Sequence, residues 1–81
     1  MEYLFRVEQT FSIPDMGLVL AGGPRTRDIR FKSRIKLVSP DNTEIEAEVW
    51  GESSYENFAI MITGIIGNEQ VPVGTVVWLY D

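Results

Sequence analysis

The fold is decided by the stretch Arg34-Ile35-Lys36-Leu37-Val38-Ser39-Pro40-Asp41-Asn42-Thr43-Glu44-Ile45-Glu46-Ala47-Glu48-Val49. Apolar and charged residues alternate on both sides of a turn that contains proline and asparagine. This pattern is typical of two half-buried strands joined as a hairpin. If both apolar sets share one face, Leu37 lies opposite Ile45 and Pro40-Asp41-Asn42 forms the loop. Asn42 is then the residue that takes the left-handed conformation.

The same two-residue period extends outward from the hairpin in both directions. We predict strands over 3–13, 18–21, 29–38, 43–50, 58–66 and 71–80, separated by turns or loops at 14–17, 22–24, 51–57 and 67–70. The residues expected to point inward are Tyr3, Phe5, Val7, Phe11 and Ile13 in the first strand, Phe31, Ile35 and Leu37 before the hairpin turn, and Ile45, Ala47 and Val49 after it. Six or seven short strands without a helical period predict one all-β domain over residues 1–81. We expect a small closed antiparallel barrel, with a sandwich as the alternative.

Composition indicates a globular chain and favours the cytoplasm over a membrane or a secreted location. Of the 81 residues, 44% are hydrophobic and 23% are charged, a balance typical of globular chains, whereas disordered chains have a lower hydrophobic content. No apolar run has the length of a membrane span, and the start of the chain lacks the features of a secretory signal. Because there is also no cysteine, we expect a cytoplasmic protein.

Positive charge is concentrated in one segment of an otherwise acidic chain. The net charge is −5, yet six of the seven basic residues lie between positions 25 and 36. In the predicted hairpin register Lys36 lies opposite Glu46 and Arg34 opposite Glu48, so part of this basic stripe is neutralised. Arg25, Arg27, Arg30 and Lys32 are left without predicted partners in and after a glycine-rich loop. They are candidates for contacting phosphate or a carboxylate surface, and an ordinary solvated loop is the alternative.

The residue types that catalysis usually requires are missing. The chain has no histidine and no cysteine, and no phosphate-binding glycine loop with lysine occurs. Asp41, Asn42, Glu44 and Glu46 could suggest calcium, but Glu44 and Glu46 lie along a predicted strand and the spacing of a calcium loop is missing. We therefore predict no enzyme, no metal site and no cofactor. The aromatic residues are either stacking platforms for a ligand or, as we favour, part of the core or its lid; they are Trp50, Tyr55, Trp78 and Tyr80.

Several segments resemble the β-barrel domain that follows the GTPase domain in translational GTPases such as elongation factor Tu. The resemblance begins at residues 7–13 with Gly17, Val19 and Gly22, and it continues through 29–31 and 35–38. It resumes at 56–65 and ends at 73–77, so that it spans roughly residues 5–79. The chain departs from the family pattern at Gln9, Met16, Ala21 and 30–33.

The resemblance implies a binding role rather than an activity. Barrels of this family pack on the GTPase domain and contact ribosomal RNA, and in factor Tu the barrel holds the aminoacylated end of tRNA. By resemblance, Glu8 and Asn57 match polar positions of that pocket, and Phe11 lies in the same motif. We expect a non-catalytic binding module whose partner is RNA, the ribosome or another protein. The alternative is a protein-interaction or homo-oligomer-forming barrel without a nucleic-acid role, with Trp78 and Tyr80 at the contact.

Overall fold

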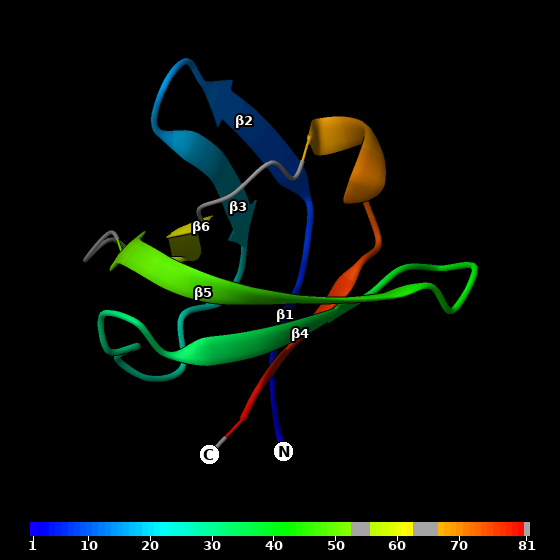
Figure 1. Cartoon of the computed structure of the whole chain (residues 1–81). Helices are drawn as coiled ribbons and strands as arrows, with labels where there is room; N and C mark the ends of the chain where they lie inside the picture. The colour runs from blue at the N-terminus through cyan, green and yellow to red at the C-terminus, as the bar shows by residue number, and fades with distance from the viewer. Residues whose placement is uncertain (53–55, 63–66, 81) are drawn as a thin grey trace.

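The computed structural model describes residues 1–52, 56–62 and 67–80 and is built from antiparallel strands (Figure 1). The strands are β1 (Glu2–Arg6), β2 (Gln9–Ile13), β3 (Gly17–Gly22), β4 (Arg34–Val38), β5 (Glu44–Glu52), β6 (Phe58–Ile62) and β7 (Val76–Leu79), with one 3-10 helix, η1 (Asn68–Gln70). They form a single sheet in the order β1-β7-β4-β5-β6-β3-β2. The prediction of an all-β fold with six or seven short strands is confirmed. Within the described ranges, no helix has the length and hydropathy that crossing a membrane requires.

The β4–β5 hairpin has the register that its sequence predicts. Leu37 lies opposite Ile45. The turn is closed by a bond from the Ser39 amide to the Thr43 carbonyl at 2.9 Å. Asn42 takes the predicted left-handed conformation, with φ of 71°, and Asp41 accepts a hydrogen bond from the Thr43 amide at 3.0 Å.

The core lies between the two halves of the strongly bent sheet. Alternate residues of β3, β4, β6 and β7 are buried, as a half-buried strand requires. Phe5 and Phe58 stack at its centre, with ring centroids 4.9 Å apart. The predicted inward residues Ile35, Leu37 and Val49 are all buried, and Ile45 and Ala47 pack against them from a half-buried position.

The two ends of the sheet are consecutive in the chain. β1 pairs with β7, and β2, which follows at once, pairs with β3. Between them, the Val7 amide donates to the Thr75 carbonyl at 2.7 Å and the Val7 carbonyl accepts from the Gly74 amide at 2.9 Å. The next amide, of Glu8, donates to the Ala21 carbonyl at 2.8 Å. The chain thus passes from one end of the sheet to the other within two residues, but β1 and β2 form no ladder with each other and a closed barrel is not confirmed.

The first predicted strand, 3–13, is divided into β1 and β2, and two of its predicted inward residues are exposed. The β1–β7 register shifts between Tyr3 and Phe5, and the irregularity turns Leu4 into the core with Phe5 and Val7. Tyr3 is consequently 51% exposed. Phe11 is 50% exposed because it lies on the outer face of β2, opposite half-buried Val19.

The strand predicted over 29–38 is shorter than expected. It begins only at Arg34, because Lys32 has a positive φ of 69° and interrupts the extended backbone. The interruption breaks the alternation, so that Ile29 is buried but Phe31 is 58% exposed, contrary to its predicted inward orientation.

Strand β5 is longer than expected, since Gly51 and Glu52, predicted to open a loop, pair with β6. Trp50 occupies the register shift between Val49 and Gly51 and is 41% exposed, so its predicted place in the core is wrong. Trp78 and Tyr80 are half-buried at the C-terminal end. Tyr55 and the second half of the strand predicted over 58–66 lie outside the described residues.

Candidate functional site

An open depression lies over the outer face of β3 and β6, with a volume of about 530 Å³. Its floor contains Ala21 and Ala59, which lie directly opposite each other in the β3–β6 ladder. Glu56 and Asn57 lie at its rim, immediately before β6. Small side chains at paired positions leave room above the sheet, and the polar residues that precede the strand border this space. The result is an apolar floor with hydrogen-bonding groups at one side, which is the usual composition of a small-ligand site.

Asn57 is held close to the loop that follows β3. An added Cβ at Gly23 would overlap the Asn57 side-chain amide, so only glycine allows the observed approach. The Arg25 amide donates to the Glu56 carbonyl at 2.8 Å, which fixes the same loop to the start of β6. The side-chain position of Asn57 therefore depends on the Gly23 backbone.

Two further predicted site residues lie beside β3: Phe11 on β2 and Glu8 immediately before it. The Glu8 amide donates to the Ala21 carbonyl, so its backbone borders the depression's floor. Phe11 lies opposite Val19, which in turn lies opposite Met61. Residues directly opposite in antiparallel strands share a face. Phe11, Val19 and Met61 therefore lie on the same face as Ala21 and Ala59, two residues away along each strand. Residues 8, 11 and 57, distant in sequence, are brought to one region of the sheet.

Arg25 and Arg27 have partners, so the prediction that they are unpaired is wrong. Arg25 contacts Glu52 through two nitrogens, Nε at 3.2 Å and Nη2 at 2.9 Å, and Asp28 at 2.7 Å. The hydrogen bonds that Arg25 donates to these carboxylates, that to Glu52 foremost, raise the pKa of Arg25. Glu52 also accepts from the Ile29 amide at 3.2 Å, and thereby holds the loop at both ends.

Arg27 is paired with Glu2 at the start of β1, with a distance of 2.6 Å. The sequence-based prediction missed both carboxylates, because Glu52 had been placed in a loop and Glu2 lies 25 residues from Arg27. Arg30, the third predicted cation of this loop, is exposed and has no ion pair within residues 1–52, 56–62 and 67–80.

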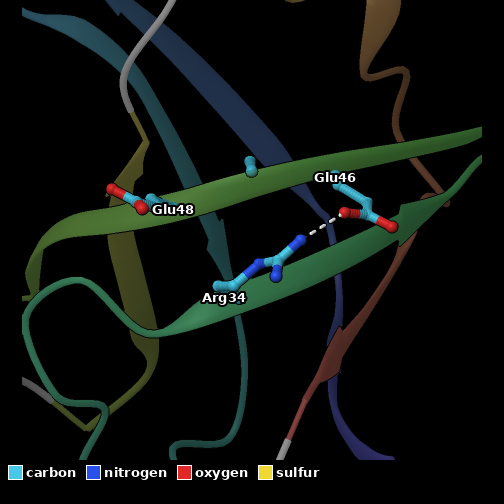
Figure 2. Close-up of a pocket in the computed structure, with 4 residues that line it drawn as sticks. Arg34, Glu46 and Glu48 are labelled. Atoms are coloured by element: carbon cyan, nitrogen blue, oxygen red, sulfur yellow. Dashed lines mark hydrogen bonds and ion pairs between the residues drawn. The ribbon is translucent and has the colours of Figure 1, made fainter.

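The basic stripe of β4 is neutralised as predicted, but by diagonal pairs. Arg34 lies opposite Glu48, yet its guanidinium bonds to Glu46 at 2.7 Å, while the Glu48 side chain points away (Figure 2). Lys36 likewise bonds to Glu44 at 2.8 Å rather than to Glu46, its directly opposite residue. Diagonal neighbours lie within reach of side chains of this length, so both contacts shift toward the turn by the same step.

The diagonal pairs continue into a small polar network. The Tyr80 hydroxyl donates to the second oxygen of Glu46 at 3.1 Å, and the Arg34 guanidinium lies 5.7 Å from the Tyr80 ring. Burial and this bond to Glu46 raise the pKa of Tyr80, and the bond to Glu44 raises that of Lys36. These charges are committed to one another, which leaves little of the stripe for a polyanionic ligand.

No cluster of three or more histidine, cysteine or acidic side chains is positioned to hold a metal ion in the part of the chain that the structure describes. Comparison of the chain with protein-family models, with curated proteins and with solved structures found no match in any of the three. The resemblance to translational GTPases rests on the sequence motifs alone.

Proposed function

We propose that the protein is a non-catalytic binding module of the translation-factor β-barrel type, with RNA as its partner. In this proposal the end of an RNA strand lies over the depression formed by Ala21, Asn57 and Ala59, beside Glu8 and Phe11. The depression itself carries the proposal: a ribose or base fits its apolar floor, and the amide and carboxylate at the rim can bond to ribose hydroxyl groups. The absence of histidine and cysteine from the chain favours binding over catalysis.

Closure of the sheet into a barrel is part of this proposal. The hydrogen bonds of Val7 with residues 74 and 75, and of Glu8 with Ala21, support it, because they connect one short segment to both ends of the sheet. Amide exchange offers a direct check. In a closed barrel the Val7 and Glu8 amides should be protected as strongly as those of β4. Exchange at the rate of a free strand end would contradict closure.

Binding can be measured by fluorescence anisotropy with a labelled eight-nucleotide single-stranded RNA. Asn57→Ala removes a rim group, and Gly23→Ala displaces the Asn57 side chain without changing it. Because one hydrogen bond contributes on the order of 1 kcal/mol, each variant should weaken binding about fivefold. Asn68→Ala, which truncates another exposed asparagine, is the matched control and should leave affinity unchanged. Equal affinities for all four proteins would contradict the site.

A protein-interaction or self-associating barrel is the second candidate, favoured by an exposed aromatic pair at the sheet end. Tyr3 is half exposed on β1, which pairs only with β7 in the described sheet, and it meets Trp78 edge to face at 5.8 Å. Aromatic residues of this kind are enriched at protein interfaces. Light scattering separates the two candidates: a mass that rises with concentration and falls after Trp78→Ser supports self-association.

A further inference from the structure

Two exposed aromatic side chains meet where strand β4 begins, next to the register shift between β5 and β6. Phe31 is 58% exposed and Trp50 is 41% exposed, and their rings contact edge to face with centroids 5.1 Å apart. They lie 19 residues apart in sequence, so tertiary structure alone brings them together. Neither ring has a place in the core cluster.

Each ring is turned outward by a local irregularity of the backbone, a positive φ after Phe31 and a register shift at Trp50. Phe31 precedes Lys32, whose φ of 69° is uncommon for a residue with a side chain. This turn is fixed to β5, since the Lys32 amide donates to the Val49 carbonyl at 2.7 Å and the Val49 amide to the Ser33 carbonyl at 2.9 Å. Trp50 lies at the β5 register shift, a feature that redirects side chains and is frequent near functional sites. The aromatic pair is therefore positioned before any partner arrives.

Of the three basic side chains without an ion pair in the described ranges, Arg30 and Lys32 flank Phe31, and the third, Arg6, lies on β1. Arg25, Arg27, Arg34 and Lys36 are all engaged in ion pairs. Arg30 and Lys32 are exposed and have no such pair in the described ranges, and Lys32 Nζ lies 5.7 Å from the Phe31 ring. In an acidic protein, two free cations next to two exposed rings form a locally positive aromatic surface.

We propose that Phe31 and Trp50, with Arg30 and Lys32, form a contact for single-stranded nucleic acid. Unpaired bases stack on the exposed rings, and the two cations contact the neighbouring phosphates. Arg30 and Lys32 favour this ligand over a second copy of the chain, because the phosphates of a nucleic acid can pair with both cations while its bases stack on the rings, although the carboxylate of Glu48, which has no ion pair in the described ranges, opposes it. A duplex binds poorly, since its bases are already stacked. The site is distinct from the Ala21–Ala59 depression and rests on the proposed function only in taking RNA as the partner.

One nearby carboxylate opposes binding and offers a second test. Glu48 precedes Trp50 by two residues on β5, and the Arg34 opposite it bonds to Glu46 instead (Figure 2). Its charge has no ion pair in the described part of the chain. Glu48→Gln removes this repulsion and should increase affinity for a polyanion.

The experiment uses the labelled eight-nucleotide RNA, the DNA of the same sequence and the corresponding duplex. Phe31→Ala and Trp50→Ala should each weaken single-strand binding at least about fivefold, the range expected for loss of one stacked base. Tyr3→Ala, which removes an exposed aromatic residue elsewhere, should leave it unchanged. The affinity should fall with salt with a logarithmic slope of about −1.4 for two phosphates.

The cations are tested without disturbing the fold. Lys32→Gly keeps the left-handed backbone and removes the charge together with the side chain that reaches the Phe31 ring, and it should reduce the salt slope by about 0.7. Arg6→Gln removes an exposed cation of β1 and is the control. Circular dichroism confirms that each variant is folded.

The outcomes separate this site from the depression. Loss of binding in Trp50→Ala and Phe31→Ala, with retention in Asn57→Ala, supports the aromatic contact alone. The reverse pattern supports the depression and overturns this proposal. Three other results would also overturn it: equal affinity for the duplex, unchanged affinity in both aromatic variants, or a concentration-dependent mass that Phe31→Ala abolishes, which would assign the rings to a second copy of the chain.

Discussion

Replacing Gly22 by alanine should destabilise the protein strongly, because β1 crosses the end of β3 at this position. A Cβ built on Gly22 would overlap the Arg6 carbonyl oxygen, lie 2.7 Å from Phe5 Cδ2 and lie 3.2 Å from the Arg6 carbonyl carbon. Gly22 is buried, so the added atom has no exit toward solvent. The contacts involve backbone, which cannot rotate away as a flexible side chain would.

The surrounding hydrogen bonds determine the size of the effect. The segment after Arg6 is fixed by the two bonds of Val7 to residues 74 and 75, so relief of the overlap requires β1 and β7 to move together. Overpacking a well-fitted core costs about 1–3 kcal/mol, and a backbone obstacle places this substitution at about 3 kcal/mol. A domain of this length has about 4–12 kcal/mol of stability in all. The loss should lower Tm by about 12–24 °C.

Urea unfolding followed by circular dichroism measures this loss, with Gly51→Ala as the matched control. Gly51 is also a strand glycine, but its added Cβ would lie 3.7 Å from Met61 Cε, an ordinary contact. That variant should gain up to about 0.5–1 kcal/mol, since alanine loses less backbone entropy than glycine. Adding Phe5→Leu to Gly22→Ala should not restore stability, because the Arg6 carbonyl remains. A loss below about 1 kcal/mol for Gly22→Ala would refute the reasoning.

Three further outcomes follow from single contacts. Phe58→Ala should cost about 3–5 kcal/mol in urea unfolding, because Phe58 is fully buried and stacks on Phe5; a loss below about 2 kcal/mol would argue against this packing. The bond from the Thr43 amide lowers the pKa of Asp41, so its contribution to stability is present above the ordinary value and is lost as pH falls through the lowered pKa. The free energy of unfolding should therefore depend less steeply on acid pH in Asp41→Asn than in the unchanged protein. An equal dependence would contradict the bond. Burial and the bond to Glu46 raise the pKa of Tyr80, so stability should fall as pH rises above the ordinary tyrosine value. Absorbance titration against Tyr80→Phe should locate its ionisation above that value, and a normal or lowered pKa would exclude the contact.

The strand pattern could be predicted because most of the information is local. In the β4–β5 hairpin the turn residues and the alternation agree on one register, and a slip by one residue would expose Leu37 and bury Lys36. Turns with glycine and proline also mark where strands end. Closure was expected from the number of short strands and remains a proposal, because among the described residues the sheet ends are joined by the bonds of Val7 and Glu8 without a ladder between β1 and β2.

The candidate sites depend on contacts that a periodic pattern does not contain. Residues 8, 11 and 57 approach one region because β2, β3 and β6 are neighbours, and the overlap at Gly23 positions Asn57. Phe31 was expected to point inward because it alternates in step with Ile35 and Leu37, and Trp50 was favoured as part of the core or its lid over a stacking platform. Neither the turn at Lys32 nor the register shift at Trp50 leaves a signal in the alternation.

The amino-acid sequence by itself determined the all-β class, the β4–β5 register and which face of that hairpin is buried, because burial of alternate side chains is a property of each strand and its nearest partner. Tertiary structure decided which charges are free and which rings face solvent. Arg25 meets Glu52 across 27 residues and Phe31 meets Trp50 across 19, and only the folded sheet sets those distances. Side-chain contacts between distant segments depend on backbone twist, bulges and turn geometry, none of which a local period encodes.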